Sequence, residues 1–526
     1  MNSLAKDTAI YGISNIINKF LNYLLVPFYT YILTTTAEYG IVTNLYSWMA
    51  LVIVVLTYGM ETGFFRFVNK EENNPNQVYC TTLCSLAFTS LLFAVIISLW
   101  HRPIAAAMGY AGHSDYIFYF GWIMAMDAFN TIPFAYLRYK NRPWRFAIIK
   151  FIGVLVNILA NIFFLLICPK LMQTAPQAVD WFYREGYEVG YVCVSNLIST
   201  CVTFLCLLPT DLEARFDFNP QLLRRMLRYS LPLLILGIAG IMNQHLDKIM
   251  MPYLFETAEE GNAQLGIYGA CAKLAMVMMI FIQAFRYAYE PYVFAKHKER
   301  NSVGSYADAT KFFAIFAMLI IIGMVAYMDI LRLIIAPAYW DGLKVVPVIL
   351  FSYLFEGIYF NLSIWYKLTD KTIWGAVFSL TGLVIIIVLN IVLVPRIGYM
   401  GCAWASLCCF LTCMLLSYFM GQKKYPVPYD LKSLAIYFGT TICLLGIFYG
   451  CRYWFANSGI MQHELFAYTL KGQHIAFMRA DLMNLLVGTA IVIAYLALVF
   501  KRDFPASNLP VVGRFFKKST NSTLGA

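Results

Sequence analysis

The sequence is a series of apolar stretches, each of roughly 20 residues or more, separated by short polar connections. A helix needs about 20 apolar residues to cross the hydrocarbon core of a bilayer. Membrane β-barrels instead show alternating segments of about ten residues, a pattern this sequence does not contain. The pattern therefore predicts an all-α polytopic membrane protein with about 14 transmembrane helices. The expected spans lie near residues 9–33, 38–66, 78–100, 115–139, 144–168, 189–209, 229–254, 265–293, 307–328, 345–367, 373–394, 399–421, 434–455 and 481–500.

Composition supports this class. The 526 residues are 60% hydrophobic and 13% charged, whereas soluble domains are about half apolar and a quarter charged. The first apolar stretch is too long for a signal peptide and contains Lys19, so we expect it to remain as the first span. The 13 cysteines lie mainly inside the apolar stretches and form no CxxC pair. This favours packing roles over a metal site or disulfides.

The Lys and Arg residues predict the orientation. An even number of spans places both termini on one side, and the loops on that side carry about three times as many Lys and Arg residues as the opposite loops. In this count Lys150 belongs to a loop at the start of the fifth span. The side richer in these residues is normally cytoplasmic. The net charge of +11 then reflects topology and contact with anionic lipid head groups, and not nucleic-acid binding.

An internal repeat relates the first six spans to the next six. A single shift of 229 residues aligns the pairs Asp127/Glu356, Arg138/Lys367, Arg142/Lys371, Ala147/Ala376, Gly153/Gly382, Asn161/Asn390 and Ile162/Ile391. Shifts of 225 and 226 align the pairs Asn18/Asn243, Pro27/Pro252, Phe28/Tyr253, Ala37/Ala263, Gly40/Gly266 and Ile41/Ile267. Because six is even, the two copies have the same orientation. Transporters built from such parallel repeats hold their substrate between the halves and rock one half on the other.

The repeat predicts a division into four parts. An N-terminal lobe of six spans covers 1–215, and a C-terminal lobe of six spans covers 216–425. An extra pair of helices follows at 426–505, and a cytoplasmic tail at 506–526.

Polar residues inside two spans indicate an aqueous cavity. A charge at the centre of a spanning helix costs about 2.5–3.5 kcal/mol, so such groups normally face protein or water. At about 100° per residue, one stripe of the first span carries Asn15, Asn18, Lys19 and Asn22. The seventh span carries Asn243, Gln244, His245, Asp247 and Lys248 within six positions. Asp247 and Lys248 also fit a structural pair that neutralises itself, although adjacent residues on a helix do not face each other.

Other ionisable residues in the spans have structural alternatives. Arg286 and Glu290 are spaced to pair with each other along one helix. Glu61 and Arg66 lie near the end of the second span, where both side chains could reach the interface. Glu61 also lies between Gly59 and Gly63, whose spacing suits close helix packing.

The residue types predict an anionic substrate and a coupling ion. Fixed cations in a cavity of low polarity bind phosphate or carboxylate well, while carboxylates and histidine serve as proton or cation sites. The predicted substrate-binding residues are Lys19, Asn15, Asn18, Asn22, Lys248, Gln244, Lys273 and Arg286. The predicted ion-coupling residues are Asp247, His245, Asp127, Glu356, Glu61 and Glu290. No catalytic residue, metal site or organic cofactor is expected, with H⁺ or Na⁺ as the coupling ion.

Several segments resemble the Wzx-type flippases, polysaccharide transporters of the multidrug/oligosaccharidyl-lipid/polysaccharide exporter superfamily. They are KFLNYLLVPFYTYILTTTAEYGIV (19–42), YGMETGFFRF (58–67), FIQAFRYAYEPYVFA (281–295) and the region 361–407, from NLSIWYKLTDKT to LNIVLVPRIGYMGCAWASL. The resemblance implies two six-helix lobes around a central cationic cavity. It also implies that an undecaprenyl-diphosphate-linked oligosaccharide moves from the cytoplasmic to the periplasmic leaflet by cation antiport and rocker-switch alternating access.

The resemblance carries further expectations. Related lipid II flippases use basic residues in the first and eighth helices, positions that Lys19 and Lys273, or Arg286, occupy by helix number. Their extra helix pair forms a groove for the lipid tail. We expect a functional monomer in the bacterial inner membrane with both termini cytoplasmic, in contact with membrane lipids and with polysaccharide polymerase or assembly proteins as partners.

Two alternatives remain at this point. A drug or organic-cation exporter of the same superfamily usually has 12 spans and an acidic cavity. A membrane polysaccharide polymerase or glycosyltransferase needs a large external loop with converging acids and bases, and no connection here exceeds about 25 residues. The protein is therefore expected not to be an enzyme.

Overall fold

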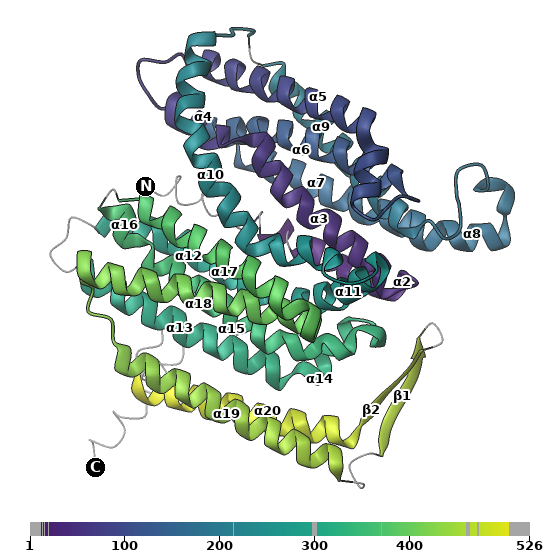
Figure 1. Cartoon of the computed structure of the whole chain (residues 1–526), viewed down its shortest axis with the longest axis vertical. Helices are drawn as coiled ribbons and strands as arrows, with labels where there is room; N and C mark the ends of the chain where they lie inside the picture. Colours follow the sequence, from purple (N-terminus) through teal and green to yellow (C-terminus); the bar gives the residue numbers. More distant parts are fainter. Residues whose placement is uncertain are drawn as a thin grey trace, which may run out of the picture. The chain divides into compact units, whose positions relative to one another are not determined.

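The computed structural model describes residues 12, 14, 16–18, 20–213, 215–296, 302–369, 371–458, 463–470 and 473–503, and most of them are helical (Figure 1). The chain forms two compact units, residues 1–273 with 372–413 and residues 274–371 with 414–526. This division follows contacts, whereas the lobes at 1–215 and 216–425 follow the sequence repeat. Those lobe boundaries stay a prediction.

The first unit contains α2 (Leu25–Ile32), α3 (Thr36–Thr57), α4 (Met60–Val68), α5 (Pro75–Ala107), α6 (Ser114–Tyr139), α7 (Pro143–Ile162), a π-helical turn (Phe163–Ile167), α8 (Cys168–Thr174), α9 (Glu188–Asp211), α10 (Pro220–Met250), α11 (Ala258–Leu274), α17 (Ile373–Ile397) and the first half of α18 (Tyr399–Lys424). The second unit contains α12 (Met276–Lys296), α13 (Ser302–Ala326), α14 (Met328–Leu331), a long 3₁₀ segment (Pro337–Val345), α15 (Val346–Leu362), α16 (Ile364–Leu368), the second half of α18, α19 (Leu431–Asn457), β1 (Glu464–Leu470), β2 (Gln473–Met478) and α20 (Arg479–Arg502).

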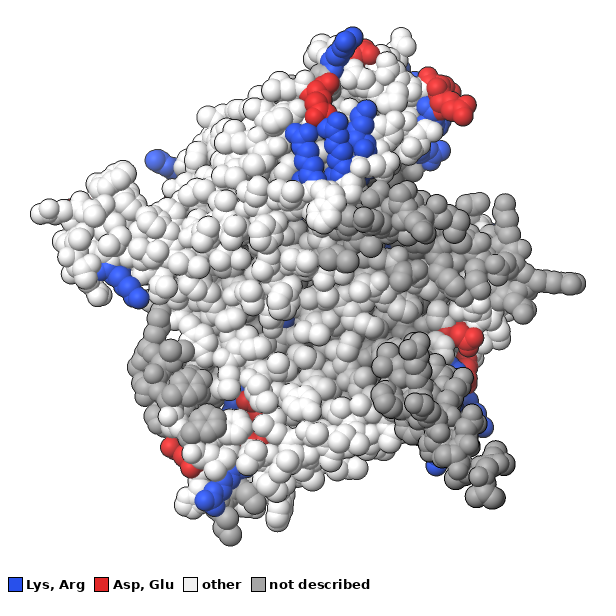
Figure 2. All heavy atoms as spheres, turned by 180° about the vertical axis from the view of Figure 1, so that it is seen from behind, with Lys and Arg blue, Asp and Glu red and all other residues white. Residues whose placement is uncertain are grey.

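The helices confirm the predicted polytopic class. Among the described residues, 11 helices are long and apolar enough to cross a membrane, or 12 if Ala258–Leu274 and Met276–Tyr287 form one span. α6 coincides with a further expected span, and part of the first expected span lies outside the described residues. In Figure 2 much of the described surface carries no charged side chain, and the charged groups gather in a few separate places.

Short sequence signals set the helix starts. At the start of α3, Thr35 accepts a hydrogen bond from the Glu38 N–H at 3.2 Å, and the Glu38 carboxylate returns to the Thr35 backbone. This reciprocal capping box satisfies two N–H groups that the helix cannot. α5 and α10 both begin at an Asn-Pro pair. The asparagine side chain caps the helix, and the proline has no N–H group that would need a partner at this position.

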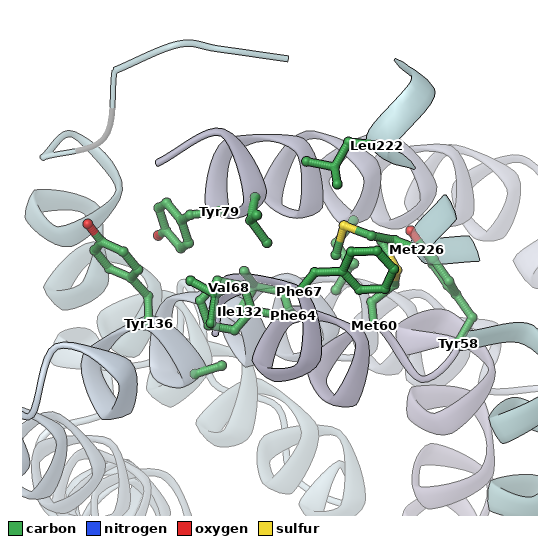
Figure 3. Close-up of a cluster of buried hydrophobic side chains, with 13 residues drawn as sticks. Tyr58, Met60, Phe64, Phe67, Val68, Tyr79, Ile132, Tyr136, Leu222 and Met226 are labelled. Atoms are coloured by element: carbon green, nitrogen blue, oxygen red, sulfur yellow. The ribbon is translucent and has the colours of Figure 1, made fainter. Parts of the chain in front are cut away.

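A buried hydrophobic cluster holds α4, α5, α6 and α10 together (Figure 3). Phe64 and Met60 on α4 are fully buried in it, and Tyr79 of α5 stacks on Tyr136 of α6 with ring centroids 3.9 Å apart. The predicted close packing at Gly63 is confirmed, because a Cβ there would lie 2.5 Å from the Ser230 hydroxyl of α10.

The sequence repeat is also a repeat of packing contacts. Gly153 of α7 packs on α9, where an added Cβ would lie 2.6 Å from Thr203 Oγ1. Its counterpart Gly382 of α17 packs on α18, where a Cβ would lie 2.7 Å from Cys413 Sγ. Both glycines therefore let a helix approach the next helix closely at the same point of each copy. The duplication predicted from the sequence is confirmed at this pair.

Ionic contacts fasten the extra helix pair to α13 and α14 at two ends. At one end Asp329 is fully buried and accepts hydrogen bonds from Arg452 of α19 at 2.8 Å and from Asn484 of α20 at 3.0 Å. At the other end Asp503 accepts from Lys311 of α13 at 2.8 Å and from Tyr437 of α19 at 2.6 Å. Asp503 directly follows the last residue of α20, and Asp329 lies three residues after the end of α13, so both carboxylates lie at the ends of long helices.

A small β-hairpin joins α19 to α20 (Figure 1). Strands β1 and β2 pair antiparallel, with Ala467 opposite Ala476 and Thr469 opposite His474. From the sequence alone we expect only a loop of about 25 residues here. Alternation of apolar and polar residues over so short a segment is a weak signal beside the long apolar stretches.

Candidate functional site

The polar cluster predicted in the seventh span lies in the last turns of α10. Asn219 accepts hydrogen bonds from two N–H groups at the start of this helix, and Pro220 takes its first position. After Met250 the chain turns into a 3₁₀ segment that contains Pro252. Proline has no N–H to continue the α-helical bonds, so the polar residues fall close to a helix end.

Lys248 bends back along α10 and pairs with its neighbour Asp247. Its ammonium lies 3.0 Å and 3.1 Å from the two carboxylate oxygens and 3.0 Å from the Gln244 carbonyl. Tyr268 of α11 donates its hydroxyl to the same carboxylate at 2.7 Å. The pair thus exists although adjacent residues start on different faces, because the flexible lysine stem spans the gap. Asp247, 1% exposed, receives its hydrogen bonds from protein groups.

Neighbouring helices hold this part of α10 through polar groups. Asn44 of α3 donates its amide to the Lys248 carbonyl at 2.9 Å. Asn243 donates to the Ser379 carbonyl of α17 at 3.0 Å. α10 packs along both α3 and α17. The backbone that carries Asp247 and Lys248 is therefore fixed from two sides.

A second cation accompanies the pair. Lys273, at the end of α11, repels Lys248 electrostatically, and both lysines and Asp247 act on His245. Within the described part of the chain Lys273 has no hydrogen-bond or ion-pair partner, and the buried Nδ1 of His245 has no hydrogen bond. When His245 is neutral, the two lysines and Asp247 together carry one net positive charge, which is centred on Lys273. An anion is the ligand that such a group attracts.

The acids of the N-terminal half also lie beside cations. Asp127 of α6 lies near Thr200 of α9 and is attracted by Lys150 of α7. Lys150, which the sequence analysis counted with a loop, lies within the helix Pro143–Ile162 with its ammonium 4.1 Å from the centre of the Phe134 ring. The attraction between Lys150 and Asp127 links residues 23 positions apart, a separation that periodicity along one helix does not reveal.

Glu61 forms an ion pair with Arg138. Arg66, which was also expected near the end of the second span, lies over the Tyr229 ring at 4.0 Å. The Glu61–Arg138 pair is about a third exposed on each side, so solvent screening leaves its contribution to stability small.

The predicted polar stripe of the first span is partly described. Asn18 is buried and Asn22 is exposed, so the two do not share one environment. Lys19 and Asn15 lie outside the described residues.

The remaining predicted residues belong to the second unit. Arg286 is exposed and lies 4.3 Å from the centre of the Phe360 ring, and Glu356 is half-buried in α15. Glu290 lies in α12, but its side chain falls outside the described part, so its pairing with Arg286 stays a prediction.

Three residues missed by the sequence analysis complete this picture. Tyr268 and Asn44 bond the α10 cluster from other helices, and Lys150 balances Asp127. Asn44 and Tyr268 lie far from Asp247 and Lys248 along the sequence, so no local pattern marks them. Only the chain's three-dimensional course brings them to the charged residues.

Residues 4–296 match the family described as Polysaccharide biosynthesis protein. The chain belongs to this family. It is also similar to Lsg locus protein 1 of Haemophilus influenzae, with 20% identity over 306 residues, covering 57% of this chain and 68% of the relative. The resemblance to polysaccharide transporters inferred from the sequence is therefore confirmed.

Two solved structures share the fold of this family member. One is the lipid II flippase MurJ in an inward closed conformation, with a TM-score of 0.69, 12% identity, and coverage of 94% of this chain and 99% of that one. The other is a MATE family multidrug resistance transporter of the MOP superfamily in an inward-facing conformation, with a TM-score of 0.60, 13% identity, and coverage of 77% and 93%. At these identities the likeness concerns the fold alone.

Proposed function

We propose that the protein moves an undecaprenyl-diphosphate-linked oligosaccharide from the cytoplasmic to the periplasmic leaflet of a bacterial inner membrane, for surface polysaccharide biosynthesis. The family and the fold support a transporter of lipid-linked saccharide. We choose an anionic substrate because of the positive cluster at α10 and α11. In this cluster Lys273 faces no described counter-ion. A drug exporter for organic cations would gain nothing from it.

In this proposal Lys273 and Lys248 bind the diphosphate. Two ammonium groups suit a group with several anionic oxygens, and their attraction grows where water is scarce. Lys248 is also held by Asp247, so a proton or Na⁺ on Asp247 would change how tightly Lys248 is held and would link the ion to the substrate through one side chain. Antiport, the expected direction of this coupling, requires that ion and substrate occupy the cluster in alternate half-cycles.

The second unit offers a place for the apolar tail. A cavity of about 330 Å³ is lined by side chains of α13, α15, α18 and α19, nearly all apolar. Phe438 and Leu434 of α19 contribute to it, so the first helix of the extra pair forms one wall. An isoprenoid chain is a suitable occupant because an apolar lining offers it van der Waals contacts in place of those with the lipid tails.

The deciding experiment is deletion and complementation. Deletion is expected to abolish surface polysaccharide and to accumulate lipid-linked glycan in the cytoplasmic leaflet, and the intact gene to restore both. Intact surface polysaccharide together with lowered drug resistance would instead establish the drug exporter.

A matched pair of variants tests the cationic cluster. Lys273→Gln is expected to lower export at least tenfold while the protein keeps or gains thermal stability, because the change removes a charge without a described partner. The exposed Lys140→Gln, at the end of α6, serves as the control with unchanged export. Full export by the Lys273→Gln variant would show that the diphosphate does not bind at this cluster.

A further inference from the structure

The first copy of the repeat contains a connection that the second copy lacks. The helix pairs α7/α9 and α17/α18 are equivalent, because Gly153 packs on α9 as Gly382 packs on α18. Gly398 alone separates α17 from α18, whereas residues 168–187 lie between the π-helical turn after α7 and the start of α9. In Figure 1 this part extends beyond the neighbouring helices of the first unit. The second copy forms its pair without such a connection, so the lobe does not need it to fold, and connections of this kind often carry function.

Residues 168–187, called the α7–α9 connection below, fold back onto the helices that they join. Tyr191 of α9 holds them, because its hydroxyl accepts a hydrogen bond from the Arg184 N–H at 2.6 Å. The Tyr191 ring also stacks on Tyr183 of the connection and on Phe164 of the π-helical turn, with ring centroids 5.0 Å and 5.2 Å apart. A surface held in this way is ordered in advance, so a ligand does not have to order it.

Trp181 presents an open aromatic ring on this connection. The residue is 80% exposed. Its indole Nε1 donates to the Ala178 carbonyl at 3.2 Å, and the ring of Phe182 packs against it with centroids 4.8 Å apart. These two contacts fix the orientation of the indole and leave most of its surface free. The ring is therefore available as a platform for stacking.

Further aromatic rings continue from this platform into the protein. Successive ring centroids lie between 4.8 Å and 6.4 Å apart along a row that runs from the connection to the start of α6. Its members are Trp181, Phe182, Phe164, Tyr191, Tyr187 and Tyr116. The exposed indole is thus the outer end of a packed aromatic row and not an isolated side chain.

Groups that accept hydrogen bonds accompany the rings. Gln177 and Asp180 are exposed close to Trp181 in the sequence, and Glu185 is exposed a few residues later. One carboxylate oxygen of Glu188 is buried and has no hydrogen bond within the described residues. Carboxylates and amides accept hydrogen bonds from hydroxyl groups, so this surface combines an aromatic face with acceptors for hydroxyls.

Carbohydrate is the ligand class that this combination suits. The face of an aromatic ring is negative, so the polarised C–H groups of a sugar pack on it, while the sugar hydroxyls donate to nearby acceptors. Residues 168–188 contain three carboxylates against two cations, Lys170 and Arg184, whereas anionic lipid head groups attract an excess of positive charge. A protein partner would bury a wider apolar patch than one indole between charged residues offers.

We propose that the α7–α9 connection is a carbohydrate-binding site, with Trp181 as the stacking platform and Asp180 as a hydrogen-bond acceptor. The inference rests on the proposed function and on the predicted topology, in which this connection lies on the periplasmic side, where the glycan of the transported lipid arrives. A site that binds the glycan on that side alone favours the translocated state by mass action.

The test measures the binding of an oligosaccharide to the purified full-length protein. The probe is the oligosaccharide released by mild acid from the lipid-linked glycan of the bacterium that carries the gene, and calorimetry gives its dissociation constant. Trp181→Ala is expected to raise this constant at least tenfold without changing the melting temperature, because the ring is exposed. Trp181→Tyr keeps an aromatic ring and should retain most of the affinity, while Asp180→Ala should weaken binding severalfold.

The matched control is Trp144→Ala, which removes an exposed tryptophan at the start of α7 and should leave the dissociation constant unchanged. Absence of binding to the parent protein, or an equal loss of affinity in the Trp144→Ala and Trp181→Ala variants, would overturn the site. Vesicles of brominated phosphatidylcholine test a membrane contact instead. A smaller quenched fraction of tryptophan fluorescence in Trp181→Tyr than in the parent protein would place Trp181 in the bilayer and also overturn the site.

The same measurements separate this site from the proposed function. Oligosaccharide binding does not require transport, so a confirmed site in a protein that fails to move lipid-linked glycan would contradict only the proposed function. Export that persists without oligosaccharide binding at Trp181 would contradict only the carbohydrate-binding site.

Discussion

Asn161 and Asn390 make the same hydrogen bond at equivalent points of the two copies. The amide of Asn161 donates to the Asn157 carbonyl at 2.8 Å, and that of Asn390 to the Ile386 carbonyl at 2.7 Å. The donors and the acceptors are each 229 residues apart. Both asparagines are fully buried. Duplication has therefore preserved the orientation of a buried side chain.

The oxygens of these two amides accept hydrogen bonds from different donors. Replacing the two asparagines should therefore lower stability by unequal amounts. Asn161 accepts from the Tyr29 hydroxyl at 3.0 Å, whereas Asn390 accepts from the Cys402 thiol at 3.1 Å. Asn161→Ala leaves a buried hydroxyl unpaired and should cost about 1–3 kcal/mol. Asn390→Ala should cost less, because a thiol is a weak donor. Thermal unfolding in detergent measures both, with exposed Asn22→Ala as the control. An equal or larger loss of stability for Asn390→Ala would contradict the assigned hydrogen-bond donors.

The Asp247–Lys248 pair predicts a non-additive response. Lys248→Met leaves a buried carboxylate without its cation and should destabilise the protein by about 3–5 kcal/mol. Asp247→Asn together with Lys248→Met removes both charges and should restore most of that stability. Unfolding of the two single variants and the double variant gives the coupling energy.

Export measured on the same variants separates two roles of the pair. A double variant that is stable but does not export lipid-linked glycan indicates a part in transport. One that is both stable and active shows that the pair serves only structure, and that the coupling ion acts elsewhere.

The sequence predicted the spans and the repeat because both rest on local or periodic signals. Runs of apolar residues mark the helices, and matched pairs such as Gly153 and Gly382 mark the duplication. It also placed Asp247 and Lys248 inside the membrane. It could not supply Tyr268, because a hydroxyl 21 residues away reaches Asp247 only through the packing of α11 on α10.

The sequence did not predict the inward position of Lys150 or the hairpin, and the physical reasons differ. Lys150 lies near the cation-rich end of its span, where hydropathy alone does not separate a loop lysine from one turned inward toward Asp127. Strands β1 and β2 depend on pairing with each other, which composition does not specify.

Replacing the buried Asp329 should strongly destabilise the packing of the extra helix pair. Asp329→Ala removes the acceptor of Arg452 and Asn484 and leaves their donors inside the second unit. We expect a loss of about 3–5 kcal/mol. The exposed Asp341, 3.2 Å from Lys344, is the matched control, and Asp341→Ala should change stability by less than about 1 kcal/mol. Thermal unfolding measures both, and similar losses would show that the Asp329 network does not fasten α19 and α20.

Asp503 predicts how stability depends on pH at the other end of this helix pair. Burial raises the pKa of Asp503, but hydrogen bonds from Lys311 and Tyr437 outweigh it, so its pKa lies below the usual value. A carboxyl whose pKa is lowered on folding stabilises the protein above the pKa of the unfolded chain, about 3.9, and loses this contribution as pH falls through the folded value. Asp503→Asn should therefore lower the melting temperature at neutral pH, and the difference from the parent protein should shrink on acidification below about pH 4. Exposed Asp180→Asn is the control, with no such difference expected at either pH. A difference that stays constant down to pH 3 would show that the ionised form of Asp503 does not provide this stability.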